Sequence, residues 1–508
     1  MCGIFFAKSS QNINELDFVR ALKKQEWRGP DAFGYLNIDD IHLGHVRLSI
    51  LDLTTSTDQP MSSKCGRYKI IYNGEIYNHL EIRKRLSLSC DTDCDTETLI
   101  EGFASVGQEI FSMLDGMFAL VIYDLKENDW WAARDRFGIK PLFMASNEQG
   151  IFLSSETISI RELVDCSVSK ESIAEWSLIR RPMPGKTFFN EIDEVLPGTI
   201  LKNGELVDLL EIASRSQAEE LDQATVERLL SDSVSFHELS DVTNVCLLSG
   251  GIDSSLITKL SSAQKTYTVG LQEHNEIAEA KETARMLGKS IESLTLSEEE
   301  LTKLWKHLIE LRGEPLSVPN EGMIYAICNQ MAAEEKVVLT GEGADEIFFG
   351  YDRIFREFSQ NNDDFTLDQF FELYAYAPKE LCTKRLEEYL FALKVNKKPI
   401  EFLEDFFYNV HLTGLLRRMD TASMAASKEA RVPFVSNELV SYLYRRKASD
   451  KIDNSYSKLP LRKMCENLGM FGPINRKKIG FSSTFSAHNS RFEEYEKFRE
   501  FNLEVLGW

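Results

Sequence analysis

The chain has 508 residues, 43% of them hydrophobic, and a formal net charge of −22 at pH 7. This length is about three times that of a typical domain, so it predicts two domains with substantial cores. The acidic balance argues against nucleic acid or an anionic membrane as partner, and no apolar stretch approaches the roughly 20 residues of a membrane span.

Cys2 follows the initiator Met1 directly, in the opening string Met-Cys-Gly-Ile-Phe. Removal of Met1 would leave a thiol and a free α-amine on one residue. The thiolate is the reactive form of cysteine and an α-amine titrates near neutrality, so the residue would carry a nucleophile and its own base. N-terminal-nucleophile hydrolases use this arrangement. Because a cysteine at position 2 is more often incidental, the assignment depends on residues farther along the chain.

Polar residues that suit an amino-acid substrate follow within the first hundred positions. Asn73-Gly74 is a strong hairpin signal, and the same turn can present an amide and a backbone N–H to an oxyanion. Arg47 can clamp a carboxylate through two hydrogen bonds, while Glu75 and Asp95 can hold an ammonium group. Two acids and one arginine around a thiol suit an α-amino acid whose side-chain carbonyl is attacked.

These residues, with the strings at 114–119, 134–142 and 196–198, resemble the glutaminase domain of class II glutamine amidotransferases. The resemblance implies that Cys2 hydrolyses glutamine to glutamate and ammonia, and that Asn73 and Gly74 form the oxyanion hole. It places nine residues around bound glutamine: Arg47, Leu48, Ser49, Ile50, Leu51, Asn73, Gly74, Glu75 and Asp95. Trp27 stands where the family usually has histidine, and we expect altered local packing there and an unaltered nucleophile.

The second half has its own landmark, the loop Ser249-Gly250-Gly251-Ile252-Asp253-Ser254-Ser255. An apolar stretch of β type precedes it and a helix-like stretch, 256–262, follows. Strand, glycine-rich turn and helix N-terminus together present several backbone N–H groups to an anion. An ordinary turn with a serine N-cap is the alternative for Ser-Gly-Gly alone. The full string is not a Walker A loop; it resembles the pyrophosphate-binding loop of ATP pyrophosphatases.

A second apolar strand pattern, 337–339, runs into the acidic turn Thr340-Gly341-Glu342-Gly343-Ala344-Asp345-Glu346. Closely set carboxylates beside a phosphate site are natural Mg²⁺ ligands, and a solvated acidic turn is the alternative interpretation. With the strings at 429–434, 458–462 and 476–481, this half resembles the synthetase domain of glutamine-hydrolysing asparagine synthetases. The two halves occur in that family's order, and the resemblance covers nearly the whole chain.

The resemblance implies roles for individual residues of the second half. Asp253 and Asp345 would hold Mg²⁺. Glu342 matches a residue linked to formation of the acyl-adenylate, and Lys458 matches a lysine that stabilises its negative charge; a surface lysine is the alternative for Lys458. The implied ATP site comprises Leu247, Ser249, Gly250, Gly251, Asp253, Ser254, Ser255, Val269, Thr340 and Gly341.

Together with the strand and helix patterns, the resemblance implies an α/β fold class in two domains. Residues 1–205 would form an αββα N-terminal-nucleophile sandwich as the amidotransferase domain. Residues 206–508 would form a doubly wound parallel α/β domain of the ATP-pyrophosphatase type, mainly helical after about residue 355. We place the linker within about 200–225, where Lys202-Asn203-Gly204-Glu205 gives way to a charged helical stretch at 216–231.

The predicted activity is synthesis of asparagine from aspartate, with glutamine as nitrogen donor and ATP with Mg²⁺ as the activating pair. Departures such as Asn275 and Thr340 leave open a different acceptor carboxylate, for example a uronic acid of a surface polysaccharide. A glutamine- or nucleotide-sensing regulator without synthetase turnover is the remaining alternative. We expect small-molecule substrates, no nucleic-acid or membrane partner, and leave a homodimer open. Nine scattered cysteines and the absence of a signal-peptide pattern favour the cytoplasm.

Overall fold

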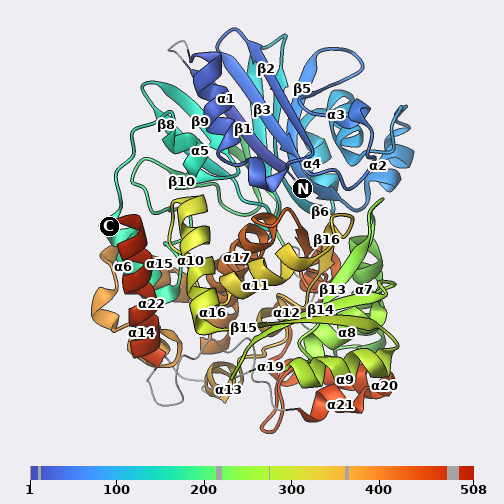
Figure 1. The fold of residues 1–508 in the computed structure, drawn as a ribbon, viewed down its shortest axis with the longest axis vertical. Helices are drawn as coiled ribbons and strands as arrows, with labels where there is room; N and C mark the ends of the chain where they lie inside the picture. Colours follow the sequence, from blue (N-terminus) through green and yellow to red (C-terminus); the bar gives the residue numbers. More distant parts are fainter. Residues whose placement is uncertain (1, 10–12, 213–219, 274, 361–364, 477–490) are drawn as a thin grey trace.

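The computed structural model describes residues 2–9, 13–212, 220–273, 275–360, 365–476 and 491–508. Two parts are stacked along its long axis: antiparallel sheets form the upper part in Figure 1, and a parallel sheet with helices forms the lower part. The N-terminus lies where the two parts meet. This arrangement confirms the expected fold class, a sandwich followed by a parallel α/β domain.

In the described residues of the upper part, two six-stranded antiparallel sheets face each other. The first has the order β10 (Asp193–Glu194), β8 (Phe143–Asn147), β9 (Gly150–Ser154), β1 (Cys2–Ser9), β3 (Ile41–Arg47), β2 (Ala32–Ile38). The second has the order β12 (Glu205–Leu209), β11 (Thr199–Lys202), β7 (Asp129–Arg134), β6 (Gly116–Asp124), β5 (Tyr68–Ile76), β4 (Met61–Ser62). Strand β1 therefore lies inside its sheet, with neighbours on both sides.

The alternation of side chains along β1 explains the four layers. Ile4 and Phe6 pack with Val121 between the two sheets, whereas Phe5 packs with Phe18 under a helix on the outer face. Successive residues of a strand point to opposite faces, so one strand serves both cores. Three helices cover the outer face of each sheet: α1 (Glu15–Lys23), α5 (Thr157–Arg161) and α6 (Lys170–Ile179) on the first, and α2 (His79–Leu86), α3 (Asp95–Val106) and α4 (Ile110–Met113) on the second.

The lower part is built on a parallel sheet that has five strands in the described residues. Its order is β15 (Ser290–Leu296), β14 (Lys265–Leu271), β13 (Asn244–Leu247), β16 (Val337–Leu339), β17 (Glu429–Arg431). One face packs on α7 (Gln223–His237), α8 (Ile252–Leu260) and α20 (Leu459–Asn467), and the other on α10 (Glu298–Arg312) and α11 (Glu321–Gln330). The strand order reverses between β13 and β16, and ligands of such sheets bind at the carboxyl ends of strands at this point.

Helices make up most of the rest of the lower part, as expected. A third core joins α13 (Asp352–Gln360), α14 (Leu367–Tyr374), α15 (Lys384–Lys394), α16 (Pro399–Phe406) and the π-helical turn η5 (Phe407–Leu412), which continues into α17 (Thr413–Met424). The remaining α-helices are α9 (Ile277–Leu287), α12 (Ala344–Ile347), α18 (Asn437–Leu443), α19 (Ala448–Lys451), α21 (Phe471–Asn475) and α22 (Arg491–Leu506). No helix in the described ranges combines the length and apolar character needed to cross a membrane.

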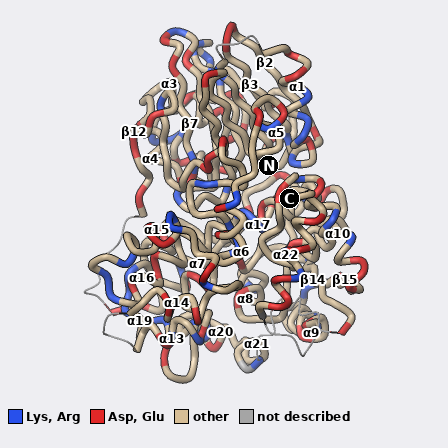
Figure 2. The backbone as a smooth tube through the Cα atoms, turned by 90° about the vertical axis from the view of Figure 1, so that its left-hand side faces the viewer, with Lys and Arg blue, Asp and Glu red and all other residues tan. Residues whose placement is uncertain are grey.

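The junction between the parts differs in detail from the expectation. Strand β12 pairs with β11 and continues the sandwich sheet to Leu209, beyond residue 205. Helix α7 begins at Gln223, whereas the sequence predicted a helical stretch from residue 216; positions 213–219 lie outside the described residues. Figure 2 shows Asp and Glu distributed through both parts, in keeping with the net charge of −22.

Candidate active sites

Cys2 is the first residue of β1 and lies opposite Arg47 of β3. It is buried, with 8% of its surface exposed, and its backbone N–H donates to Asn73 Oδ1 at 3.0 Å. Burial raises the pKa of the Cys2 thiol. The residue that the sequence singled out is therefore held at its backbone nitrogen by a side chain from the facing sheet. Met1 lies outside the described residues.

Asn73 and Gly74 lie within β5, so the hairpin turn considered for this pair is absent. A Cβ on Gly74 would lie 2.1 Å from the carbonyl oxygen of Met117 on β6, which explains glycine at this position. The side-chain Nδ2 of Asn73 is buried and has no hydrogen-bond partner among the described residues. A buried donor without a partner is costly, so this amide is suited to an oxygen supplied by a ligand.

The two acids predicted to bind an ammonium group already have protein partners. Asp95 accepts hydrogen bonds from Tyr72 Oη at 2.7 Å and from the Ile76 N–H at 2.9 Å. Glu75 Oε2 accepts from Arg431 Nη2, in the lower part of the molecule, at 3.0 Å. Burial raises the pKa of Glu75 well above its ordinary value, and nearby Asp95 adds to that rise while Arg431 opposes it. The second oxygen of Glu75, Oε1, has no partner among the described residues.

Arg47 was expected to clamp a substrate carboxylate, but its guanidinium binds the loop at 52–58. Nη1 donates to the Thr54 carbonyl at 2.8 Å and to Asp58 Oδ1 at 2.7 Å. Nη2 donates to the Asp52 carbonyl and to Thr57 Oγ1, each at 2.5 Å. In this structure Arg47 therefore positions the loop at 52–58, whose Thr57 lines the cavity beside Cys2.

The cavity beside Cys2 is small, about 30 Å³. Its lining is Cys2, Arg47, Leu48, Ile50, Leu51, Thr57, Gln59, Tyr72, Gly74, Glu75, Cys94, Asp95 and Thr96. Of the predicted glutamine-binding residues, Ser49 and Asn73 are not in this lining. Asn73 contacts Cys2 directly, whereas the Ser49 carbonyl accepts from Lys336 of the lower part at 3.2 Å. Sequence reasoning missed Thr57, Gln59, Tyr72 and Thr96; the positions of Tyr72 beside Asn73 and of Thr96 beside Asp95 were the signals that the sequence offered.

The second site lies where β13 and β16 end. The loop after β13 turns at Gly250, whose φ of 83° is in the left-handed region that favours glycine, and leads into α8. Within it, the Ser249 N–H donates to Ser254 Oγ at 3.1 Å. Helix α8 begins at Ile252, so its first N–H groups and this loop face the same region, as an anion site requires.

Lys458 joins the two carboxylates that the sequence assigned to Mg²⁺. Its Nζ lies 2.6 Å from Asp253 Oδ2 and 2.6 Å from Asp345 Oδ1. A Cβ on Gly350 would lie 2.0 Å from Asp345 Oδ1 and 2.2 Å from Lys458 Cε, so the contact needs glycine there. Two carboxylates that converge on one cation are the donors that Mg²⁺ prefers, and these residues therefore fit the ion. No cluster of three or more His, Cys, Asp or Glu suited to a metal occurs in the described ranges.

Two cavities meet at this loop and share Ser249, Gly251, Asp253 and Asp345. The larger, about 440 Å³, is also lined by Gly250, Ile252, Glu276, Glu279, Gly350, Asp352, Ser457, Lys458, Arg462, Pro473 and Arg476. The smaller, about 290 Å³, is also lined by Arg180, Leu247, Ser254, Asn320, Thr340, Gly341, Glu342, Gly343, Tyr351, Leu415, Arg418 and Met419. We call the second the Arg180 cavity.

Most of the predicted nucleotide residues line these cavities, with two exceptions. Ser255 is fully buried in α8, and Val269 packs in a core on β14. Sequence reasoning missed the basic side chains Arg180 and Arg418, and it noted Arg476 only as the first residue of the string at 476–481. Arg418 Nη2 forms an ion pair with Glu342 Oε1 at 2.7 Å. Of the string at 476–481, residues 477–481 lie outside the described residues.

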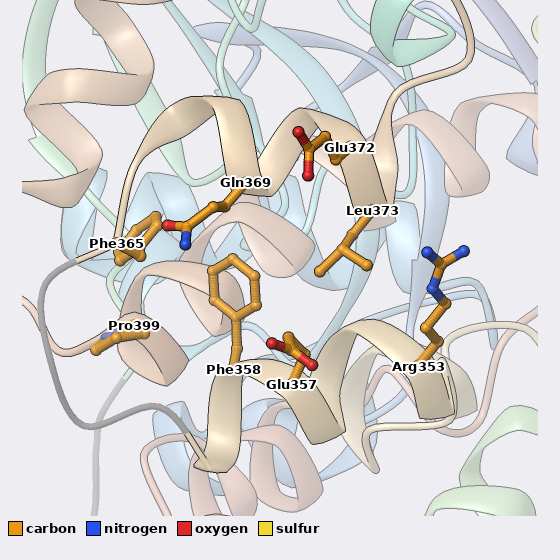
Figure 3. A pocket seen from close by; sticks show the side chains of 8 residues that line it. All are labelled: Arg353, Glu357, Phe358, Phe365, Gln369, Glu372, Leu373 and Pro399. Atoms are coloured by element: carbon orange, nitrogen blue, oxygen red, sulfur yellow. The ribbon is translucent and has the colours of Figure 1, made fainter.

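A cavity of about 330 Å³ lies away from both sites, between α13, α14 and the start of α16. Figure 3 shows its lining: Arg353, Glu357, Phe358, Phe365, Gln369, Glu372, Leu373 and Pro399. None of these residues was predicted to take part in either site. Its charges have both signs and its lining lacks the glycine-rich loops of the nucleotide region, so it is not a candidate active site.

Buried ion pairs connect the two parts between the sites. Arg431, on β17, pairs with Glu429 at 2.5 Å and with Glu75 at 3.0 Å. Asp420, on α17, pairs with Arg28 at 2.9 Å and with Lys140 at 3.2 Å. Trp27, the departure noted in the sequence, packs in a small apolar cluster that spans the same interface. Charged groups from both parts are therefore fixed against each other beside Cys2.

Comparisons with known proteins match both halves. The model of the glutamine amidotransferase domain matches residues 1–207, and that of asparagine synthase matches residues 225–504. Asparagine synthetase (glutamine-hydrolysing) 1 of Bacillus subtilis is 28% identical, over 95% of this chain and 87% of the relative. A putative asparagine synthetase (glutamine-hydrolysing) of Mycobacterium bovis is 27% identical, over 91% and 83%. Amidase chyE of Penicillium rubens is 34% identical, over 68% of this chain and 56% of the relative.

Proposed function

The chain belongs to the asparagine synthase family, and on this premise we propose that it is a glutamine-hydrolysing asparagine synthetase. It would convert aspartate, glutamine and ATP into asparagine, glutamate, AMP and pyrophosphate. The family membership and the amidotransferase match support the general reaction, a ligase step fed by glutamine. The choice of aspartate as acceptor is the specific part of the proposal.

The observation that carries the proposal is the meeting of Lys458, Asp253 and Asp345 beside the Ser249–Ser254 loop. One ammonium and two carboxylates converge there, next to helix N–H groups and two cavities. This set suits a nucleotide triphosphate whose α-phosphorus is attacked and whose pyrophosphate leaves. A regulator that senses glutamine alone has no use for such a set, and one that senses a nucleotide would bind ATP without releasing pyrophosphate.

In the proposed glutaminase step, Cys2 attacks the amide carbon of glutamine. The thiol proton passes to the α-amine that Cys2 gains when Met1 is removed. The resulting oxyanion receives hydrogen bonds from Asn73 Nδ2, the buried donor without a partner, and from the Gly74 N–H. Ammonia leaves with a proton returned by the amine, and water then hydrolyses the thioester to glutamate.

In the proposed activation step, a carboxylate oxygen of the acceptor attacks the α-phosphorus of ATP. The loop at 249–254 and the start of α8 bind the pyrophosphate that leaves. Lys458 neutralises negative charge that builds up during this displacement. Asp253 and Asp345 would hold Mg²⁺, which neutralises phosphate charge when bound. Glu342, fixed by Arg418, would lie beside the acyl-adenylate.

Ammonia then attacks the acyl carbon of the adenylate, and AMP leaves as the amide forms. Ammonia released to solvent at neutral pH would be protonated and lost as a nucleophile. The two steps therefore require transfer between the parts without exposure to water. The buried ion pairs at the interface lie in the region where such a transfer would occur.

The test is pyrophosphate release from MgATP and ammonia, measured with and without aspartate, with the amide product identified by mass. Aspartate-dependent pyrophosphate together with asparagine supports the proposal. Active glutaminase with pyrophosphate release that ignores aspartate contradicts it, and a panel of uronic acids would then be tried as acceptors.

A further inference from the structure

Arg180 comes from the sandwich half of the chain but lines the Arg180 cavity of the synthetase half. It follows α6 as its C-cap, with φ of 68° and ψ of 13°. This left-handed conformation is normally taken by glycine, and it costs free energy for any residue with a Cβ. A strained backbone that carries a long cationic side chain into a cavity points to a use for that side chain.

The surroundings of Arg180 contain no acid that neutralises it. Its Nη2 lies 3.2 Å from His411 Nδ1, and its guanidinium stacks 4.0 Å from the ring centre of Tyr376. Among the described residues it forms no ion pair, whereas adjacent Arg181 pairs with Glu194 at 2.5 Å and Arg418 pairs with Glu342 at 2.7 Å. Arg180 is therefore the cation of this cavity whose charge the described residues leave uncompensated.

A neutral histidine holds Arg180 in place. Burial, reinforced by Arg180 and Arg418, keeps the pKa of His411 well below its ordinary value. Tyr351 donates to Glu346 Oε1 at 2.6 Å, so its oxygen can accept from His411 Nε2 at 3.0 Å. His411 Nδ1 is then an acceptor that faces both Tyr374 Oη, at 2.7 Å, and Arg180 Nη2, at 3.2 Å, an assignment made from the network. The guanidinium is thus oriented without being neutralised.

We propose that Arg180 determines acceptor specificity by binding the second, non-reacting carboxylate of the acceptor. A guanidinium binds carboxylate through two parallel hydrogen bonds, and the same cavity reaches the Asp253 loop and Glu342, where the other carboxylate is activated. Aspartate satisfies both ends through its α- and β-carboxylates. A uronic acid has one carboxylate and would leave Arg180 uncompensated. This inference rests on the proposed function and specifies its substrate class.

The experiment compares aspartate with 3-aminopropanoate, which is aspartate without its α-carboxylate, in the wild-type protein and in Arg180→Gln. With ammonia and MgATP, pyrophosphate release gives kcat/KM for each acceptor. We expect Arg180→Gln to lower kcat/KM for aspartate by about 100-fold, chiefly through KM, because a buried charge pair is lost. The value for 3-aminopropanoate should stay within about 3-fold, and Arg180→Lys should restore part of the loss.

Arg353→Gln is the matched control, because Arg353 is exposed at the start of α13 and lines only the remote cavity. Glutaminase activity and melting temperature verify that each variant folds. Equal losses for both acceptors in Arg180→Gln, or no loss for aspartate, would overturn the inference. Wild-type protein that makes no amide from aspartate would instead contradict the proposed function.

In that second case, calorimetry with aspartate and succinate in the presence of ATP decides the role of Arg180. If aspartate or succinate binds to the wild-type protein but not to Arg180→Gln, the dicarboxylate site is supported and only the reaction is reassigned. Absence of binding to the wild-type protein, or equal binding to both proteins, overturns the site.

Discussion

The two candidate sites differ in how their residues are held. Cys2 lies on β1 of one antiparallel sheet, and Asn73 and Gly74 lie on β5 of the other, beside a cavity of about 30 Å³ that Cys2 and Gly74 line. The synthetase residues lie on loops at the ends of parallel strands, around cavities of about 440 and 290 Å³. Strands fix a nucleophile closely, whereas loops leave room for a nucleotide and an acceptor. Each site is thus built on the kind of element that its step needs, and the steps should be separable by mutation.

The largest effect should come from Cys2→Ala. Loss of the nucleophile should lower glutamine-dependent synthesis by roughly 10⁴-fold or more, while ammonia-dependent synthesis stays within about 2-fold. Product formation with each nitrogen donor measures this. Cys65→Ala, at an exposed cysteine, is the control. Loss of both activities in Cys2→Ala would contradict the separation of the sites.

Lys458→Met should produce the converse pattern. Asp253 and Asp345 would lose the ammonium that joins them, and charge in the transition state would go unneutralised. We expect pyrophosphate release to fall roughly 10³-fold with glutaminase retained. Lys463→Met, at an exposed lysine of α20, the helix that Lys458 precedes, should behave as wild type. Full ATP-dependent synthesis by Lys458→Met would show that the second site is misassigned.

Asn73→Asp tests the amide that the comparison rests on. The substitution keeps the Oδ1 that accepts from Cys2 but replaces the Nδ2 donor with an oxygen. We expect kcat of glutaminase to fall by about 10²-fold, with ammonia-dependent synthesis unchanged. Asn73→Ala, which removes both groups, should be at least as impaired. An active Asn73→Asp would exclude this amide from the oxyanion hole.

The smallest expected effect is on the pH dependence of stability, and here the two halves of the chain should behave alike. Each buries a histidine, His45 in the sandwich and His237 in the synthetase half, and burial lowers both pKa values to about 3. The unfolded chain binds a proton below the ordinary histidine pKa of 6.5, but folded His45 stays neutral down to about 3. Protons therefore favour the unfolded state in this window, and stability falls as pH drops through it.

Replacing His45 should remove that acid sensitivity. Between pH 7 and pH 5, the free energy of unfolding should fall by about 2 kcal/mol less in His45→Gln than in the wild type. Denaturant unfolding at each pH measures this difference. His237→Gln should show a similar change, and His307→Gln, at an exposed histidine, should show none. Parallel pH curves for His45→Gln and wild type would mean that His45 is not neutral in the folded protein.

Prediction from sequence succeeded best where function depends on short strings. The loop at 249–255 and the pair Asp253 and Asp345 were identifiable because a strand, a glycine-rich turn and a helix start occur in succession. Arg180 and Arg418 escaped detection, because each reaches its cavity from a helix far along the chain. The turn assigned to Asn73-Gly74 was absent because pairing of β5 with β6 overrode a local turn preference.

The sequence by itself determined the fold class, through the family that its motifs resemble, and the chemical identity of the reactive groups, because those motifs are short and continuous in the chain. Only the tertiary structure decided which charges meet. It joined Glu75 to Arg431, placed Lys458 between two carboxylates, and brought Arg180 of the first half into the cavity of the second. Such contacts depend on how distant segments pack, and a side chain's neighbours across an interface leave no periodic signal in the chain.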